Sequence, residues 1–380
     1  MISVGIITMH KVWNAGSALQ AYALQRIIED LGYDAQLIDY EYPNIEHRAF
    51  ANNVKDANSL NLWGAMKLLI QKIKARFLKS KHNELYSSFY NKYFHCTNIA
   101  YNSRRSLFDN VPEFDIYVTG SDQVWNPQYI GFDTSYLLDF IPDNAVRISY
   151  AASFSNNSIP SYMEGDYARC LSKYKAISVR EESGKQLVHK LIGKDATVCC
   201  DPTLLLNKEQ WSKLAADSSL RIKKKFILIY IMGYAYDPYP GIYKHINDVV
   251  DFFKLPVIFY NSRRGTYKPP YGEIHIKECG PAEFLWLFEN ASFVITDSFH
   301  GTAFSLNFNK PFISVVKEIE NADSRVYNLL VIAGTTDRAV VCGEDFELNE
   351  NIIKEPSCLK LEGLRDSSLE YLKTQLNHKQ

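Results

Sequence analysis

The segment with the clearest fold signal reads Phe293-Val-Ile-Thr-Asp-Ser-Phe-His-Gly-Thr-Ala-Phe-Ser-Leu-Asn-Phe308. Its first four residues are apolar or β-branched, which is typical of a buried parallel strand. From Thr302 onward, apolar residues recur at helical spacing. The segment therefore predicts a strand that turns tightly into a helix. Open α/β sheets place their chemistry at such turns, at the carboxyl ends of their strands.

His300 lies within this turn, beside the expected N-terminus of the helix. The positive end of a helix disfavours an imidazolium, so a neutral ring here would suit a general acid or base near pH 7. The same position also suits a capping or packing histidine. The segment alone leaves both interpretations open.

The composition fits a protein with two α/β cores and no general affinity for nucleic acid. The chain has 380 residues, 46% of them hydrophobic. Lys+Arg (42) and Asp+Glu (43) nearly balance, so any anion site must be local. The aromatic content of 13% suits sugar-binding surfaces and ordinary cores equally.

The cysteines and the N-terminus predict a cytoplasmic protein. The seven cysteines are scattered, with no C-x-x-C and no Cys/His pair at metal-ligand spacing, so we expect a reducing compartment, buried thiols and no structural zinc. Met1 leads directly into an expected strand at 3–8 without a signal-peptide pattern, and no run of about 20 apolar residues predicts a membrane span.

The first residues predict a βαβ unit with a strand at 3–8, a helix at 17–31 and a strand at 35–39. No G-x-G-x-x-G follows the first strand, which argues against dinucleotide binding. Residues of about 45–110 are helical in pattern and predict a helical insertion. The lysine-rich face of this insertion fits a solvated surface or a membrane-surface contact.

Two further strand ends carry polar residues. The strand at 114–119 runs into Gly120-Ser-Asp-Gln-Val-Trp-Asn126, in which Ser121 and Asp122 could cap a helix or bind hydroxyls. Trp125 offers a stacking face, or else is a core residue. The strand at 176–179 runs into Arg180, which predicts a cation at the sheet edge, or an ion pair with Glu181 or Glu182.

The β/α alternation restarts after the charged run 221–225 and ends in an amphipathic helix at 361–376. We therefore predict two Rossmann-like α/β lobes, at 1–206 and 207–380. Their site is expected in the cleft between them.

Five segments, in this order, resemble the polysaccharide pyruvyl transferase family from Ile2 to about Leu330. They are Asn14-x-Gly-x-x-Leu-Gln-Ala-Tyr-Ala-Leu24, Gly120-Ser-Asp-Gln-Val-Trp-Asn126, Val179-Arg-Glu181, Asp201-Pro-Thr203 and Thr296-Asp-Ser-Phe-His-Gly-Thr302. The resemblance implies a fold like that of GT-B glycosyltransferases. It also implies transfer of pyruvate from phosphoenolpyruvate to a sugar of a capsule or exopolysaccharide, as a ketal and without a metal or resident cofactor.

The resemblance also implies roles for individual residues. The catalytic set is His300, Asp122 and Arg180; the donor set is Ser298, Gly301, Thr302 and Arg325; the acceptor set is Asn14, Gly16, Gln20, Gly120, Ser121 and Trp125. Many family members have an arginine two residues before the histidine, where this chain has Ser298. Arg325, expected in the first turn of the next helix, is the candidate replacement.

Two other functions fit the same pattern. A nucleotide-sugar-dependent glycosyltransferase would need a carboxylate for the ribose, which Glu318 or Glu320 could supply. A glycan-binding protein without catalysis would explain the aromatic residues. The sugar acceptor could be lipid-linked or nucleotide-linked, and transient membrane association stays open.

Overall fold

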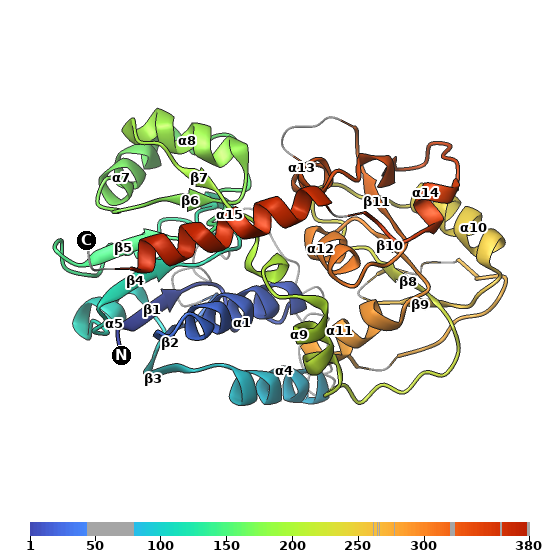
Figure 1. Cartoon of the computed structure of the whole chain (residues 1–380), viewed down its shortest axis with the longest axis horizontal. Coiled ribbons are helices and arrows are strands. Elements are labelled where there is room, and N and C mark those ends of the chain that lie inside the picture. Colours follow the sequence, from blue (N-terminus) through green and yellow to red (C-terminus); the bar gives the residue numbers. More distant parts are fainter. Residues whose placement is uncertain are drawn as a thin grey trace, which may run out of the picture. The chain divides into compact units, whose positions relative to one another are not determined.

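The computed structural model describes residues 1–43, 80–260, 262–263, 265, 267–276, 278–319, 324–357 and 359–377 (Figure 1). The chain divides into two compact units, one comprising Met1–Pro202 and Tyr371–Gln380, the other Thr203–Glu370. The predicted boundary between 206 and 207 stays a prediction. The last turns of the C-terminal helix belong to the first unit, where the Tyr371 hydroxyl donates a hydrogen bond to the Ser149 carbonyl.

The first unit contains a parallel sheet of order β3-β2-β1-β4-β5. Its strands are β1 (Ser3–Ile7), β2 (Asp34–Tyr40), β3 (Cys96–Tyr101), β4 (Ile116–Thr119) and β5 (Val146–Ser149). A short parallel pair, β6 (Ser178–Val179) and β7 (Thr197–Val198), adjoins β5 through isolated bridges. The carboxyl ends of all these strands therefore meet at one edge.

The helices of the first unit connect these strands. They are α1 (Ala15–Asp30), α4 (Ser80–Tyr93), α5 (Arg104–Asp109), α6 (Pro127–Ile130), α7 (Ser161–Leu171) and α8 (Glu182–Ile192), with 3₁₀ turns at Thr134–Leu137 and Pro202–Leu204. The predicted insertion at 45–110 is corrected in part, because β3 is a strand that pairs with β2. Residues 44–79 of that insertion lie outside the described part of the chain.

The second unit contains a parallel sheet of order β12-β11-β10-β8-β9. Its strands are β8 (Ile227–Tyr230), β9 (Val257–Phe259), β10 (Phe293–Thr296), β11 (Phe312–Val316) and β12 (Ala339–Val341). Every residue of β8, β10 and β11 is buried, as expected for a sheet covered on both faces.

Helices separate the strands of the second unit. They are α9 (Lys208–Ala215), α10 (Ile242–Phe253), α11 (Pro281–Asn290), α12 (Phe299–Asn307), α13 (Arg325–Ala333), α14 (Glu350–Ile353) and α15 (Leu359–Leu376), with a 3₁₀ turn at Thr336–Arg338. The strand, turn and helix predicted at 293–308 are confirmed as β10 and α12. No helix in the described ranges is long and apolar enough to cross a membrane.

Candidate active site

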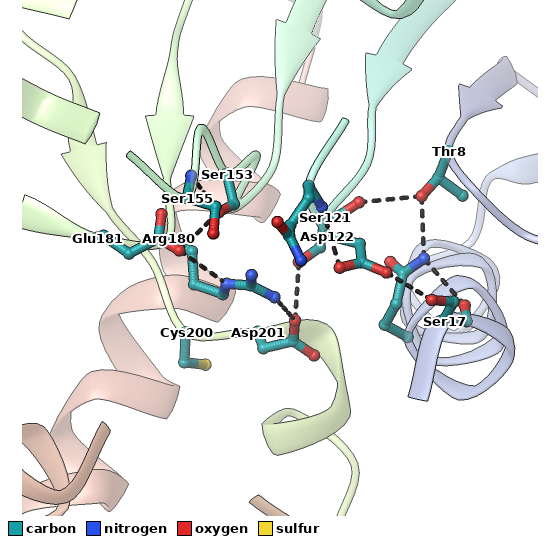
Figure 2. A network of polar contacts seen from close by, with 12 residues as sticks. Thr8, Ser17, Ser121, Asp122, Ser153, Ser155, Arg180, Glu181, Cys200 and Asp201 are labelled. Atoms are coloured by element: carbon teal, nitrogen blue, oxygen red, sulfur yellow. Dashed lines mark hydrogen bonds and ion pairs between the residues drawn. The ribbon is translucent and has the colours of Figure 1, made fainter. Parts of the chain in front are cut away.

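A buried network of polar side chains occupies the carboxyl edge of the first sheet (Figure 2). After β4, Ser121 Oγ donates a hydrogen bond of 2.8 Å to Asp201 Oδ2, which follows β7. After β1, Thr8 Oγ1 donates to the Ser121 carbonyl across 3.0 Å. The side-chain amide of Gln20 donates to Thr8 Oγ1 across 2.9 Å. Residues distant in sequence are therefore held together because parallel strands end at the same edge.

Arg180 lies inside this network and not at its surface. Its Nη1 donates to Asp201 Oδ2 across 2.9 Å, and its Nε lies 3.3 Å from Glu181 Oε1. Burial acts to lower the pKa of Arg180, but the carboxylates of Glu181 and Asp201 outweigh it and the pKa is raised. The predicted ion pair with Glu181 is confirmed. A contact of Arg180 with the donor stays a prediction.

Asp122 adopts a backbone conformation that few side chains tolerate. Its φ is 72°, in the left-handed region that aspartate accepts more readily than most residues. The turn directs Oδ2 toward Ser17, whose Oγ donates across 2.6 Å, while Oδ1 accepts the Gln123 amide across 2.9 Å. The predicted catalytic role of Asp122 stays a prediction.

The predicted acceptor residues around Asp122 are mostly positioning residues in this structure. A Cβ at Gly120 would lie 3.0 Å from Thr8 Cβ and 3.1 Å from Leu24 Cδ2, so glycine is needed for packing. Gln20 and Ser121 are fully buried. Asn14 caps α1 by accepting the Ser17 amide. Gly16 lies buried in the first turn of that helix.

Trp125 does not present a stacking face. Its side chain is completely buried, its indole Nε1 donates to the Tyr136 carbonyl across 3.1 Å, and its ring packs edge-on against Tyr174. The predicted sugar contact is therefore corrected to the alternative, a core tryptophan. Phe132 and Tyr162 are among the exposed aromatic residues of the first unit, and their ring centroids lie 5.8 Å apart.

In the second unit, Ser298 caps the helix that carries the predicted histidine. Its Oγ accepts the Gly301 amide of α12, and its side chain also bonds the buried Tyr230 hydroxyl. Thr302 Oγ1 donates to the Ser298 carbonyl and lies 2.7 Å from Ser314 Oγ. These contacts set the direction of α12 at the carboxyl end of β10.

Gly301 is required by the close approach of α12 to the sheet. A Cβ at this position would lie 2.1 Å from Thr296 Oγ1 and 2.9 Å from Tyr230 Cδ1. In this structure Gly301 and Thr302 therefore serve the cap and the packing of α12. Direct contacts of either residue with a donor stay predictions.

Asp297, which the sequence-based site omits, organises the neighbouring loop. Its carboxylate accepts the amides of Met232 and Gly233, across 2.6 and 2.8 Å, directly after β8. Burial raises the pKa of Asp297, and these two hydrogen bonds oppose the shift only in part. The sequence feature that could have identified Asp297 is its position immediately after the strand β10.

His300 and Arg325 begin neighbouring helices at the carboxyl edge of the second sheet. His300 is half-buried in the first turn of α12, with its ring edge-on to Phe299. Arg325 is half-buried at the first position of α13, which Ser324 caps and whose first turn holds no acidic residue. Lys317, an exposed lysine directly after β11, was missed although it follows an apolar strand just as Arg180 does.

The structure brings four of the eight predicted first-unit residues into one network and places the second-unit residues at the starts of α12 and α13. Ser121, Asp122, Arg180 and Gln20 are linked through Thr8, Ser17 and Asp201. Asp201 and Glu181 join the site residues, although the sequence motifs assigned them no role. Ser153 is a further addition, because its Oγ donates to Glu181 Oε1 across 2.6 Å.

Comparisons with known proteins agree with this architecture. A sequence model of the polysaccharide pyruvyl transferase family matches residues 14–316. The UDP-GlcNAc 2-epimerase of Methanocaldococcus jannaschii superposes with a TM-score of 0.52 at 14% identity, covering 100% of this chain and 94% of the epimerase. The Neisseria meningitidis UDP-GlcNAc 2-epimerase, solved with UDP-GlcNAc bound, gives 0.50 at 12% identity, covering 99% and 93%. These likenesses confirm the predicted α/β fold of GT-B type. No curated protein matches the sequence.

Proposed function

We propose that this chain, which belongs to the polysaccharide pyruvyl transferase family, transfers a pyruvyl group from phosphoenolpyruvate to a sugar of a cell-surface polysaccharide or its precursor. The product would be a pyruvate ketal. The observation that carries the proposal is His300 in the first turn of a capped helix at the end of β10, with Arg325 and Lys317 following the adjacent strand β11.

The proposed reaction defines what the protein must supply. Two sugar hydroxyls form bonds to C2 of the donor, the C2–O–phosphate bond breaks, and inorganic phosphate leaves. One hydroxyl proton is balanced by the proton gained at the methylene carbon, the other by the proton gained by phosphate. Neither step requires an electron acceptor, so side chains that move protons and bind anions are sufficient. We propose no resident cofactor or metal in these steps.

The donor is proposed to bind the second unit. Its phosphate and carboxylate need cations and helix N-termini, which α12, α13, Arg325 and Lys317 supply at one sheet edge. His300 would then donate a proton to the methylene carbon or to the departing phosphate.

The acceptor is proposed to bind the first unit. Asp122 is the proposed proton acceptor for a sugar hydroxyl: its two carboxylate oxygens accept from Ser17 Oγ and from the Gln123 amide, and each keeps a further lone pair. Asp201, Glu181 and Arg180 hold the surrounding loops. With Trp125 buried, the exposed rings of Phe132 and Tyr162 are the proposed apolar surface for the sugar.

One incubation series tests the proposal. The protein is mixed with phosphoenolpyruvate and a panel of lipid-linked and nucleotide-linked sugars while phosphate release is recorded. Release that requires both substrates, with a mass gain on the sugar that matches a pyruvate ketal, is the expected result. Release of a nucleoside diphosphate from a nucleotide sugar, without phosphoenolpyruvate, would instead establish a glycosyltransferase and overturn the proposal.

A further inference from the structure

Three side chains with metal-binding atoms meet beside β1 and β2, apart from the residues used above. His10 follows β1, Asp39 is the penultimate residue of β2, and Cys96 opens β3. One ligand atom from each residue lies within 4.8 Å of the others. The sequence could not show this group, because the three residues are far apart along the chain and only strand pairing brings them together.

The orientation of His10 suits a metal ligand. Its Nδ1 lies 3.1 Å from the Thr8 carbonyl, which can only accept, so the proton belongs on Nδ1. The other ring nitrogen, Nε2, faces Asp39 Oδ1 across 3.3 Å, and its lone pair would be directed at an ion held between these two atoms. A backbone carbonyl that fixes the tautomer in this way is the usual partner of a metal-ligating histidine.

Asp39 has a comparable outer partner. Lys11 Nζ lies 2.6 Å from Oδ2, which leaves Oδ1 directed toward the histidine. The Asp39 side chain is only 12% exposed and the His10 side chain 0%, so the pair is shielded from bulk water. An ion pair between His10 and Asp39 alone would account for these two residues, but it gives no reason for the thiol beside them.

We propose that His10 Nε2, Asp39 Oδ1 and the Cys96 thiolate bind one divalent ion of the zinc class. Imidazole, carboxylate and thiolate together are a donor set that zinc prefers, whereas magnesium and calcium prefer oxygen alone. Three protein ligands leave a fourth tetrahedral position for water. On binding, the Cys96 proton passes to solvent and the sulfur bonds to the metal.

The ion would stabilise the loop between β1 and α1. Thr8, whose carbonyl accepts from His10, also donates from Oγ1 to the Ser121 carbonyl in the polar network of the first unit. The same loop ends at Asn14, the cap of α1. The proposal does not depend on the pyruvyl transfer proposed above, because it is tested by metal binding and thermal stability.

Cobalt titration tests the site, since cobalt replaces zinc and its thiolate bond absorbs light. Full-length protein is stripped with EDTA, dialysed and titrated with Co²⁺, and then with Zn²⁺ as competitor. The test variant is Cys96→Ser. The control is Cys342→Ser, another half-buried cysteine that lies in the second unit. We expect a thiolate-to-cobalt band that saturates at one ion per chain in the wild type and the control, and no band in Cys96→Ser.

The thermal midpoint gives an independent readout. Zn²⁺ should raise it in the wild type and in Cys342→Ser but not in Cys96→Ser. If Cys96→Ser fails to fold, Asp39→Asn serves instead: the cobalt band should persist, but at a Co²⁺ affinity more than about tenfold weaker. If the wild type shows neither a cobalt band nor a shift of its thermal midpoint, the proposal is overturned and His10 and Asp39 form only an ion pair. A band unchanged in Cys96→Ser would also overturn the proposal.

Discussion

Arg180 Nη1 lies 2.9 Å from Asp201 Oδ2, and the two side chains are 3% and 0% exposed. The same carboxylate oxygen accepts the Ser121 hydroxyl, and Glu181 lies on the other side of the guanidinium. The arginine therefore lies between two buried carboxylates and offsets part of their negative charge within the polar network of the first unit (Figure 2). Its first role in this structure is to hold the ends of β4, β6 and β7 together.

Arg180→Ala should lower the free energy of unfolding by about 3–5 kcal/mol, because it leaves Asp201 and Glu181 as uncompensated buried charges. Arg180→Lys keeps the charge but cannot contact Asp201 and Glu181 at the same time, so it should lower the free energy of unfolding by less than Arg180→Ala. Urea unfolding measures both. Arg169→Ala, which breaks only an exposed pair with Asp166, is the control and should stay within about 0.5 kcal/mol. A stable Arg180→Lys protein with a raised KM for phosphoenolpyruvate would instead support a direct donor contact.

His300→Ala should lower kcat by about 100-fold or more while the protein remains folded, as expected for loss of a general acid or base. Phosphate release under saturating substrates gives kcat, and circular dichroism checks the fold. The matched control is His95→Ala, an exposed histidine paired with Glu29 in the first unit. Near-normal turnover in folded His300→Ala would remove the histidine from the chemistry.

The order of elements was largely predictable because buried parallel strands and amphipathic helices have clear local periods. The strand predicted in the first four residues of 293–308 matches β10, and the helix predicted at 361–376 matches α15 apart from two residues at its start. Strand β3 was missed because three of its residues are exposed and it lies at the edge of the sheet, so no continuous apolar run marks it.

The candidate site was less predictable because burial and partners depend on tertiary packing. Trp125 and Arg180 have sequence neighbours that suit either a surface or a core. Only the fold places the indole in the core and the guanidinium between two carboxylates. Asp201 could be recognised as part of a motif, but its hydrogen-bonding partners lie on loops distant in sequence, and no local sequence pattern predicts that these loops meet.

His245 should make stability depend on pH. Burial lowers its pKa, which its contact with the Val341 carbonyl opposes only in part. Below about pH 6.5 the unfolded chain binds a proton that the folded protein resists, so stability falls as pH decreases through that value toward the lowered pKa. The slope is at most about 1.4 kcal/mol per pH unit.

His245→Gln removes the titration and keeps an acceptor for the Gly343 amide, which lies 2.9 Å from Nε2. From pH 7.5 to 5.5 the wild type should therefore lose more unfolding free energy than the variant, by roughly 1 kcal/mol. Urea midpoints at three pH values measure the difference. Parallel pH profiles in the two proteins would contradict the prediction.

Phe132→Ala combined with Tyr162→Ala should raise the KM for the sugar acceptor and leave the KM for phosphoenolpyruvate unchanged. The two rings are 64% and 70% exposed and contact each other in a tilted arrangement, so their loss removes an apolar surface with little effect on the core. Phe252→Ala, an exposed aromatic of α10, is the control. An unchanged acceptor KM would exclude this surface from recognition.

The positively charged side chains that are proposed to bind the donor allow the sharpest test of the proposed function. Ser298 cannot simply be exchanged for the arginine common in the family, because its side chain caps α12 at Gly301 and bonds Tyr230. Loss of that cap costs about 1 kcal/mol. In the proposed function, the phosphate and carboxylate of the donor are bound instead by Arg325 and Lys317, which follow the strand next to β10.

Arg325→Ala and Lys317→Ala should each raise the KM for phosphoenolpyruvate by about 10–100-fold, since a hydrogen bond to a charged group contributes about 1.5–3 kcal/mol. Arg325→Lys should recover part of the loss, because charge is kept without the planar fork. Introducing Ser298→Arg into Arg325→Ala should restore donor binding only partly, because the new arginine supplies a cation but removes the serine that caps α12. Initial rates at varied phosphoenolpyruvate give the values, with Lys213→Ala on the exposed face of α9 as the charge control. If Arg325→Ala and Lys317→Ala both bind the donor as the control does, the anion site does not lie at this edge of the second sheet, and phosphoenolpyruvate loses its main structural support as the donor.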